Sequence, residues 1–259
     1  MTWAGRRQLF IILLVFGTAS AFLFWHFRSA IYVAPTCTDA KQNGDEVGVD
    51  CGGACLNFCD SQIKDPIVVW RRAFPVTDSV YNAVAYVENG NDAVIQEIPY
   101  EFRLYDEKGG FVARANGITR LNPLGRYAIV ETGIKVGNQK VGKTTFEFEK
   151  PAMPWLRVND DIKKLRAQVS EVLIEDTDTA PKVSAMVTNT SPTVTLSNTE
   201  IAVVLYDANN NAINTSKTYL QTIKPNEKIP VFFTWPKPFP ETVARYEIIP
   251  ILDIFRAKK

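Results

Sequence analysis

The hydrophobic pattern of this chain separates one long apolar run from a series of short alternating segments. The run covers residues 9–25 without a charge. A helix rises about 1.5 Å per residue, so the run together with His26 and Phe27 approaches the ~30 Å hydrocarbon core of a bilayer. Such a helix satisfies its own backbone hydrogen bonds and can reside in lipid. The pattern therefore predicts a transmembrane helix over residues 9–27.

The charges around this run predict its orientation. Arg6, Arg7 and the terminal amine precede it, whereas only His26 and Arg28 follow closely. Because lysine and arginine favour the cytoplasmic side, we expect residues 1–8 in the cytoplasm and the domains after the helix on the outer side of the cell membrane. A cleaved signal peptide is the alternative, since residues 19–21 read Ala-Ser-Ala. The apolar run continues beyond that site, which favours an uncleaved signal-anchor.

After residue 61 the pattern changes to short runs that alternate with a period of two. Residues 84–89, 100–106 and 145–149 alternate in this way, and turn residues such as Asn-Gly-Asn at 89–91 separate them. This period is typical of half-buried strands. Outside the membrane segment the strongest helical signal is at residues 160–166, enough for a turn or two. The exported part is predicted to be all-β.

Three blocks of the β-rich region repeat at a nearly constant spacing. Residues 79–89 align with 179–189, residues 102–106 with 203–207, and residues 121–125 with 223–227. The spacing is about 100 residues, the size of one immunoglobulin-like sandwich. We therefore predict two tandem immunoglobulin-like β-sandwiches, over residues 62–155 and 156–259.

The repeated unit resembles the FxLYD-type domain of prokaryotic surface proteins. The first copy has the whole motif at residues 102–106, and the second has Val203 in place of the phenylalanine, followed by Leu205, Tyr206 and Asp207. The resemblance implies immunoglobulin-like architecture and an extracytoplasmic location, without a particular chemistry. In a strand, Phe102 and Leu104 share one face and are expected in the core, while Asp106 is expected to start the turn.

All four cysteines lie close together beyond the membrane segment. They are Cys37, Cys51, Cys55 and Cys59. Their even number, clustering and exported position predict two disulfides in a cysteine-rich module over residues 34–61. The segment resembles a C-x-D-x-x-x-N-G-x-E-x-x-x-D-C-G-G-x-C motif of secreted and surface proteins, which implies extracellular location. Zinc is the alternative use of four thiolates, although the spacing differs from that of a zinc ribbon.

Oxygen-bearing side chains in the same module raise the question of calcium. The candidates are Asp39, Asn43, Asp45, Glu46 and Asp50. Carboxylate and amide oxygens suit this cation, but the spacing is not that of an EF-hand loop. Solvated turn residues are the plainer interpretation.

Charge and composition argue against several function classes. Basic and acidic residues number 29 and 28, so no basic excess points to nucleic acid. The chain has one histidine, which removes most metal sites and any triad that uses imidazole as a base. The carboxylate pairs Glu147/Glu149 and Asp160/Asp161 are expected on solvated surface rather than in a glycosidase site. We expect no enzyme activity and no cofactor.

The resulting functional prediction is a structural, scaffold or adhesion role in a cell-surface assembly. Its partners would be the lipid bilayer, through the N-terminal helix, and other surface proteins. The alternative is a binding module for carbohydrate or peptide. The aromatic side chains of residues 235–239 are the best candidates for stacking on a sugar, although aromatic residues of sandwiches more often lie in the core. Asn189 and Asn214 each begin a glycosylation sequon.

Overall fold

The computed structural model describes residues 3–31 and 36–256. The predicted limits at residues 1, 34 and 259 lie outside these residues. The chain divides into two compact units, Met1–Gly53 and Ala54–Lys259, and each is described by itself.

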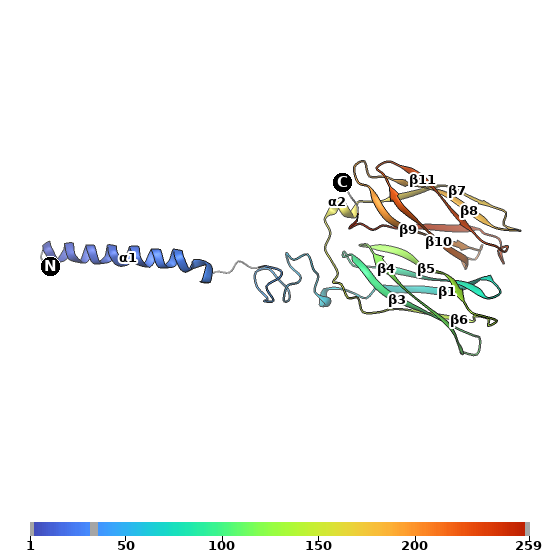
Figure 1. Cartoon of the computed structure of the whole chain (residues 1–259), viewed down its shortest axis with the longest axis horizontal. Coiled ribbons are helices and arrows are strands. Elements are labelled where there is room, and N and C mark those ends of the chain that lie inside the picture. Colours follow the sequence, from blue (N-terminus) through green and yellow to red (C-terminus); the bar gives the residue numbers. More distant parts are fainter. Residues whose placement is uncertain (1–2, 32–35, 257–259) are drawn as a thin grey trace. The chain divides into compact units, whose positions relative to one another are not determined.

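The first unit begins with the apolar helix. Helix α1, Trp3–Ile31, is uninterrupted (Figure 1). Its stretch Trp3–Phe27 is long and apolar enough to cross a membrane, judged by length and composition, and none of the stretch is buried in protein. The Thr18 hydroxyl donates to the Leu14 carbonyl oxygen at 2.9 Å, so its polar group is satisfied within the helix. The helix extends beyond the predicted residues 9–27 because helical hydrogen bonding continues past the apolar side chains.

The second unit contains four three-stranded antiparallel sheets, arranged as two β-sandwiches (Figure 1). A short 3-10 turn, η1 at Asp60–Gln62, precedes the first sandwich. One sheet of this sandwich has the order β1-β2-β5, with β1 at Ile67–Thr77, β2 at Val80–Asn89 and β5 at Gly125–Lys135. The other has the order β4-β3-β6, with β3 at Ile95–Tyr105, β4 at Phe111–Leu121 and β6 at Lys143–Phe148.

The second sandwich uses the same order of pairing. Its first sheet is β7-β8-β11, with β7 at Ala167–Glu175, β8 at Lys182–Asn189 and β11 at Lys228–Thr234. Its second sheet is β10-β9-β12, with β9 at Leu196–Tyr206, β10 at Ala212–Ile223 and β12 at Arg245–Ile251. Between the sandwiches lies the single-turn helix α2, Asp160–Lys163, where the sequence indicated a turn or two. The all-β prediction for this part of the chain is confirmed.

The strand pattern places the motif side chains as predicted. Phe102 and Leu104 are fully buried in the first core, and Leu205 is fully buried in the second. Tyr105, which the alternation turns away from the core, is half-buried. Period-two alternation thus identified the core face of β3 correctly.

The turn after each motif strand is held by the motif aspartate. The Oδ1 atom of Asp106 accepts the backbone N–H groups of Lys108 at 2.8 Å and Gly110 at 2.7 Å. In the second sandwich, Asp207 holds the corresponding turn through two backbone N–H groups at the same distances. The predicted turn role of Asp106 is confirmed, and its physical basis is the satisfaction of amides that no strand pairs.

A buried asparagine organises the loop after the second strand of each sandwich. Asn89 donates to the carbonyl oxygens of Ala93 and Asn122 and accepts the Asn91 N–H. Asn189 makes the corresponding contacts in the second sandwich, to the carbonyl oxygens of Val194, Ile223 and Lys224 and from the Ser191 N–H. Because Asn189 is fully buried and Asn214 is only 5% exposed, neither sequon presents its amide for glycosylation in the folded chain.

Candidate functional site

The two sandwiches pack against each other through one sheet of each. Sheet β1-β2-β5 and sheet β10-β9-β12 contribute to a shared apolar cluster, here called the interface cluster. Its fully or nearly fully buried members are Phe74, Val84, Ala128, Val130, Ala202, Val204, Tyr206 and Ala212. Several of these side chains are small, so the two sheet faces can approach closely. The central strands β2 and β9 are consequently apolar on both faces.

The two cores also exchange one residue each. Ile251, at the end of β12, belongs to the core of the first sandwich, and Val94 of the first sandwich belongs to the core of the second. Leu252 and Ile254 follow Ile251 and are buried in the second core. Each core therefore contains apolar surface supplied by the other half of the chain.

Aromatic rings extend the interface cluster toward its rim. The rings of Trp70 and Tyr86 stack with centroids 5.4 Å apart, and Tyr206 meets Trp70 edge-on at 6.3 Å. The Arg245 guanidinium lies 3.8 Å from the centre of the Tyr206 ring. Burial, together with Glu247, raises the pKa of Tyr86 to about 12, and burial and Glu247 also raise the pKa of Tyr206. Both phenols are therefore neutral over the physiological range.

A buried amide crosses the interface. The Nδ2 atom of Asn82 donates to the carbonyl oxygen of Thr215 at 3.0 Å, and its Oδ1 atom accepts the Gly133 N–H at 3.0 Å. Nearby, the Arg72 guanidinium donates to the carbonyl oxygen of Ala212 at 3.2 Å. Because buried amides must be paired, Asn82 specifies how the two sheets align.

An ion pair also crosses the interface and is largely shielded from water. Lys217 Nζ lies 3.8 Å from Glu131 Oε1, with exposed side-chain fractions of 12% and 20%. The Tyr100 hydroxyl donates to the same oxygen at 2.6 Å, and burial together with Glu131 raises the pKa of Tyr100. A Cβ at Gly117 would lie 2.4 Å from that hydroxyl and 2.5 Å from the Glu131 carboxylate, so a larger residue there would displace the hydrogen-bonded pair. Breaking such a pair leaves a charge without a partner, which makes the alignment specific.

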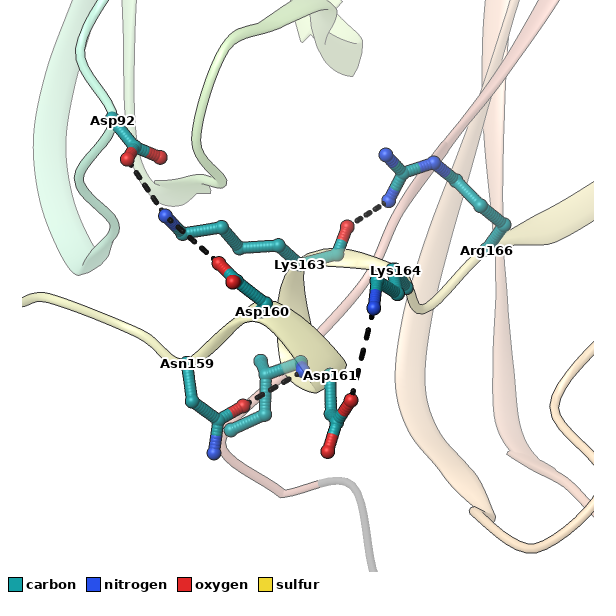
Figure 2. Close-up of polar contacts among 8 residues, drawn as sticks. Asp92, Asn159, Asp160, Asp161, Lys163, Lys164 and Arg166 are labelled. Atoms are coloured by element: carbon teal, nitrogen blue, oxygen red, sulfur yellow. Dashed lines mark hydrogen bonds and ion pairs between the residues drawn. The ribbon is translucent and has the colours of Figure 1, made fainter.

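The linker between the sandwiches is fastened at helix α2 (Figure 2). The Asn159 Oδ1 atom caps the helix by accepting the Ile162 N–H at 2.9 Å. Lys163 Nζ reaches back to Asp92 of the first sandwich at 2.7 Å and lies 3.7 Å from Asp160 (Figure 2). Asp160 and Asp161 are 84% and 88% exposed, as expected for solvated carboxylates. Exposed pairs contribute little stability, so this contact positions the linker more than it strengthens it.

The cysteine-rich module is held together by disulfides rather than by an apolar core. All four cysteines, Cys37, Cys51, Cys55 and Cys59, are disulfide-bonded, so the fold contains the two predicted disulfides. Oxidised sulfurs do not supply thiolates, and the zinc alternative is therefore wrong. Gly53 has a φ of +55°, and a Cβ there would lie 1.6 Å from the Asp45 carbonyl oxygen. This position therefore requires glycine.

The calcium candidates of the module act as turn residues. The Asp50 carboxylate accepts the N–H groups of Asp39 and Ala40, each at 2.9 Å. The Asn43 side-chain amide donates to Asp39 at 2.9 Å and holds the pKa of that carboxyl below its usual value. The Glu46 carboxylate accepts the Asn43 N–H at 3.1 Å. Asp39, Asn43 and Asp50 are thus brought together, whereas Asp45 is exposed.

The predicted sugar-stacking aromatic lies in the core. Trp235 is 3% exposed, its indole Nε1 donates to Asn214 Oδ1 at 2.9 Å, and Phe239 packs edge-on at 5.0 Å. A ring with its faces covered cannot stack on a ligand, so the core position expected for sandwich aromatics holds for Trp235 and the sugar-stacking alternative does not. Phe239 is half-buried. The sequence shows the aromatic residues but not which of them the sandwich buries.

Comparison with known proteins leaves the chain without a family. No protein-family model matches the sequence, and no curated protein matches it. Among solved structures, the chain is similar to red sea bream transglutaminase (12% identity, covering 74% of this chain and 30% of that one, TM-score 0.24). It is also similar to a β-glucuronidase from glycoside hydrolase family 2 (9% identity, covering 86% and 28%, TM-score 0.24). The chain spans less than a third of either structure, and likenesses at these scores carry no argument about fold or activity.

Proposed function

We propose that this protein is a single-pass membrane protein that presents a disulfide-bonded module and two rigidly joined sandwiches on the outer face of the cell membrane. Its role would be that of a scaffold or spacer in a cell-surface assembly. Helix α1 supports the anchor, and the disulfides support an oxidising, extracytoplasmic compartment. The observation that carries the scaffold role is the interface cluster.

The interface cluster supports rigidity because of its composition. Domains within one chain usually meet through polar interfaces and move relative to each other. Here two sheet faces bury the interface cluster, exchange Ile251 and Val94 between cores, and align through Asn82. Separating the sandwiches would expose this apolar surface to water at roughly 25 cal/mol per Å². A joint that keeps the two sandwiches in one fixed arrangement would let them hold partners in a fixed arrangement, as a scaffold must.

We also infer that the two halves are copies of one FxLYD-type domain. The shared pairing order and the equivalent contacts of Asp106 and Asp207 support this inference. The matching environments of Asn89 and Asn189 support it too. A non-enzymatic role belongs to the same proposal, and it is supported by the exposure of the carboxylate pairs considered for hydrolysis.

Labelling of intact cells tests the topology. A membrane-impermeant amine reagent is expected to modify Lys41 and later lysines, and mass spectrometry is expected to find residues 1–25 still attached. Recovery of a soluble protein that begins at Phe22 would overturn the anchor.

Distance measurements on the full-length protein in detergent test the rigid joint. Spin-labelled unnatural residues at Glu107 and Asp178 are expected to give a narrow distance distribution. Val204→Asp, which places a charge in the interface cluster, is expected to broaden it, whereas Ile118→Asp, at a side chain that is 65% exposed, is not. A broad distribution in the parent protein would contradict the scaffold proposal.

A further inference from the structure

Strands β1 and β6 are edge strands of the two sheets of the first sandwich, and they lie close together without pairing. Among the described strands, β1 pairs only with β2 and β6 pairs only with β3. Two hollows lie between these edges. The larger, of about 650 Å³, is bordered by Val68 of β1 and Phe146 of β6, and the smaller, of about 390 Å³, by Arg71 and Thr144 further along the same strands. We call the two hollows together the β1/β6 seam.

The larger hollow has an apolar floor and an acidic rim. Its floor includes Phe148, Met153 and the almost fully buried Trp155. Four exposed carboxylates and one lysine border it: Asp60, Asp65, Glu147, Glu149 and Lys150. Within the described residues, none of these carboxylates forms an ion pair, although Arg103 interacts electrostatically with Glu147. Unpaired negative charge around an apolar floor favours a ligand that is both apolar and cationic.

The smaller hollow carries the opposite charge. Arg71, Arg72 and Lys143 line it, without an acidic residue among its lining side chains. The seam is therefore acidic near the C-terminal end of β6 and basic near its N-terminal end. A ligand that follows the whole seam needs positive charge at one end and negative charge at the other.

The edge of β6 is the better template for an added strand. The N–H of Glu149 donates to the Pro99 carbonyl oxygen at 2.9 Å, so in an antiparallel ladder the alternate residues Phe148 and Phe146 turn their backbone groups to the free side. The pairing of β6 with β3 runs without a register shift. By contrast, β1 has shifts at Val68/Trp70 and near Pro75, which interrupt its edge.

We propose that the β1/β6 seam binds an extended segment of a partner protein, which adds to β6 as an antiparallel strand. In this orientation the segment's N-terminal end lies at the acidic hollow and carries lysine or arginine, and its C-terminal end lies at the basic hollow and carries aspartate or glutamate. Alternate apolar side chains fill the floor. At about 3.3 Å per residue, a segment of roughly 8 residues spans the seam. The proposal deepens the scaffold role. It rests on that role in one respect, that the partner is another exported protein.

Peptide binding to the full-length protein in detergent tests this proposal. The probe is a fluorescein-labelled, end-capped Lys-Val-Lys-Val-Thr-Val-Glu-Val-Glu peptide, and anisotropy reports binding. The same composition in the order Glu-Val-Glu-Val-Thr-Val-Lys-Val-Lys is expected to bind at least tenfold more weakly. Equal binding of the two, or none by either, would overturn the proposal and leave the topology and rigidity tests unaffected.

A matched pair of variants locates the site. Asp65→Asn, Glu147→Gln and Glu149→Gln together are expected to weaken binding of the first peptide at least tenfold, because they remove three of the four carboxylates of the acidic rim. Glu175→Gln, Asp176→Asn and Asp178→Asn make the same charge change on an exposed turn of the second sandwich and are expected to change binding less than twofold. Equal effects of the two sets would show non-specific charge attraction and overturn the site.

Backbone methylation of the peptide separates strand addition from side-chain contact alone. N-methyl groups on the odd-numbered or on the even-numbered residues block opposite edges of an extended peptide. One of the two methylated peptides is expected to lose binding and the other to retain it, since only one edge meets β6. If both bind like the parent peptide, strand addition is overturned.

Discussion

The two sandwiches share a hydrogen-bond framework but differ in where their large side chains lie. In the first, Phe102 packs against Phe146 across β3 and β6, with ring centroids 4.8 Å apart. In the second, the corresponding neighbours across β9 and β12 are Val203 and Ile248, and the buried aromatics of the core cluster are Phe233 and Trp235. Phe146 of β6 lies in the first core and also borders the β1/β6 seam, whereas Trp235 lies in the second core. The framework leaves each copy free to use its edges differently.

The difference also shows what joins the two sandwiches. The framework contacts of Asn89 and Asn189 lie at loops, whereas the interface cluster lies on the faces of β2 and β9. The asparagine contacts stabilise each sandwich, and the interface cluster holds the two sandwiches together. Variants of each set can therefore be compared directly.

Removing the central leucine of either core is expected to have the largest effect. Leu104→Ala and Leu205→Ala should each lower the free energy of unfolding by ~2–5 kcal/mol, because each leaves a cavity at a fully buried position. Urea denaturation of the full-length protein should show one transition for both, since the sandwiches share the interface cluster. Leu173→Ala, at a side chain that is 53% exposed, is the control. Two unfolding transitions, of which each variant shifts only one, would show that the sandwiches unfold independently and would contradict their coupling.

Removing the loop asparagines is expected to have the next largest effect. Asn89→Ala and Asn189→Ala should each lower the free energy of unfolding by about 2 kcal/mol, because each leaves buried backbone carbonyl groups without a hydrogen-bond donor. The same denaturation experiment measures both, with the exposed Asn209→Ala as control. A large cost in one copy and none in the other would contradict the shared framework.

Alkaline pH is expected to weaken the interface and the cores moderately. Burial raises the pKa of Tyr86 and of Tyr127 to about 12, above their value of about 10 in the unfolded chain. A raised pKa stabilises the fold below pH 10, and this contribution is lost as the pH rises from about 10 through 12. At pH 11 the loss from Tyr86 should be below about 1 kcal/mol, since its ring is partly solvated. Thermal unfolding between pH 8 and 11 measures it.

Two variants sharpen this result. Tyr86→Phe, which has no phenol to ionise, should show a shallower loss of melting temperature over the same range. Tyr246→Phe, at a tyrosine that is 44% exposed, should follow the parent protein. A parent protein whose stability does not change up to pH 11 would contradict the burial of the interface tyrosines.

The turn aspartates are expected to give the smallest effect. Asp106→Asn should cost about 0.5 kcal/mol, because an amide oxygen can still accept both turn N–H groups. Asp106→Ala, which loses the acceptor, should cost more in the same denaturation experiment. A cost for Asp106→Asn as large as that for Asp106→Ala would show that the charge, rather than hydrogen bonding, holds the turn.

Acid tests the turn aspartate of the second sandwich, Asp207. Burial acts to raise the pKa of Asp207, but hydrogen bonds from Asn211 and Asn209 hold it below its ordinary value. A lowered pKa contributes stability above the unfolded value, and this is lost as the pH falls through the folded pKa. Asp207→Asn should therefore flatten the loss of stability on acidification below about pH 4.

The sequence by itself determined the local elements of this protein. An uncharged apolar run of this length satisfies its own backbone hydrogen bonds as a helix, and α1 contains it. Alternation of period two identified Phe102 and Leu104 as core residues, and the chemistry of aspartate identified the turn at Asp106. Four clustered cysteines indicated the disulfide-bonded module. Each of these signals is carried by neighbours in the chain, so no knowledge of the tertiary structure is needed to read it.

Only the tertiary structure decided which surfaces meet. Apolar residues on both faces of β2 and β9 are visible in the sequence, yet they do not say which sheet covers the second face. Asn82, Glu131 and Lys217 look like surface residues in the sequence, but the packing of two sheets buries Asn82 and partly covers the other two. The seam depends on which strands end as edges, and Trp235 is buried by side chains distant in the chain. Burial is a property of packing between distant segments, so it is settled only when the sandwiches assemble.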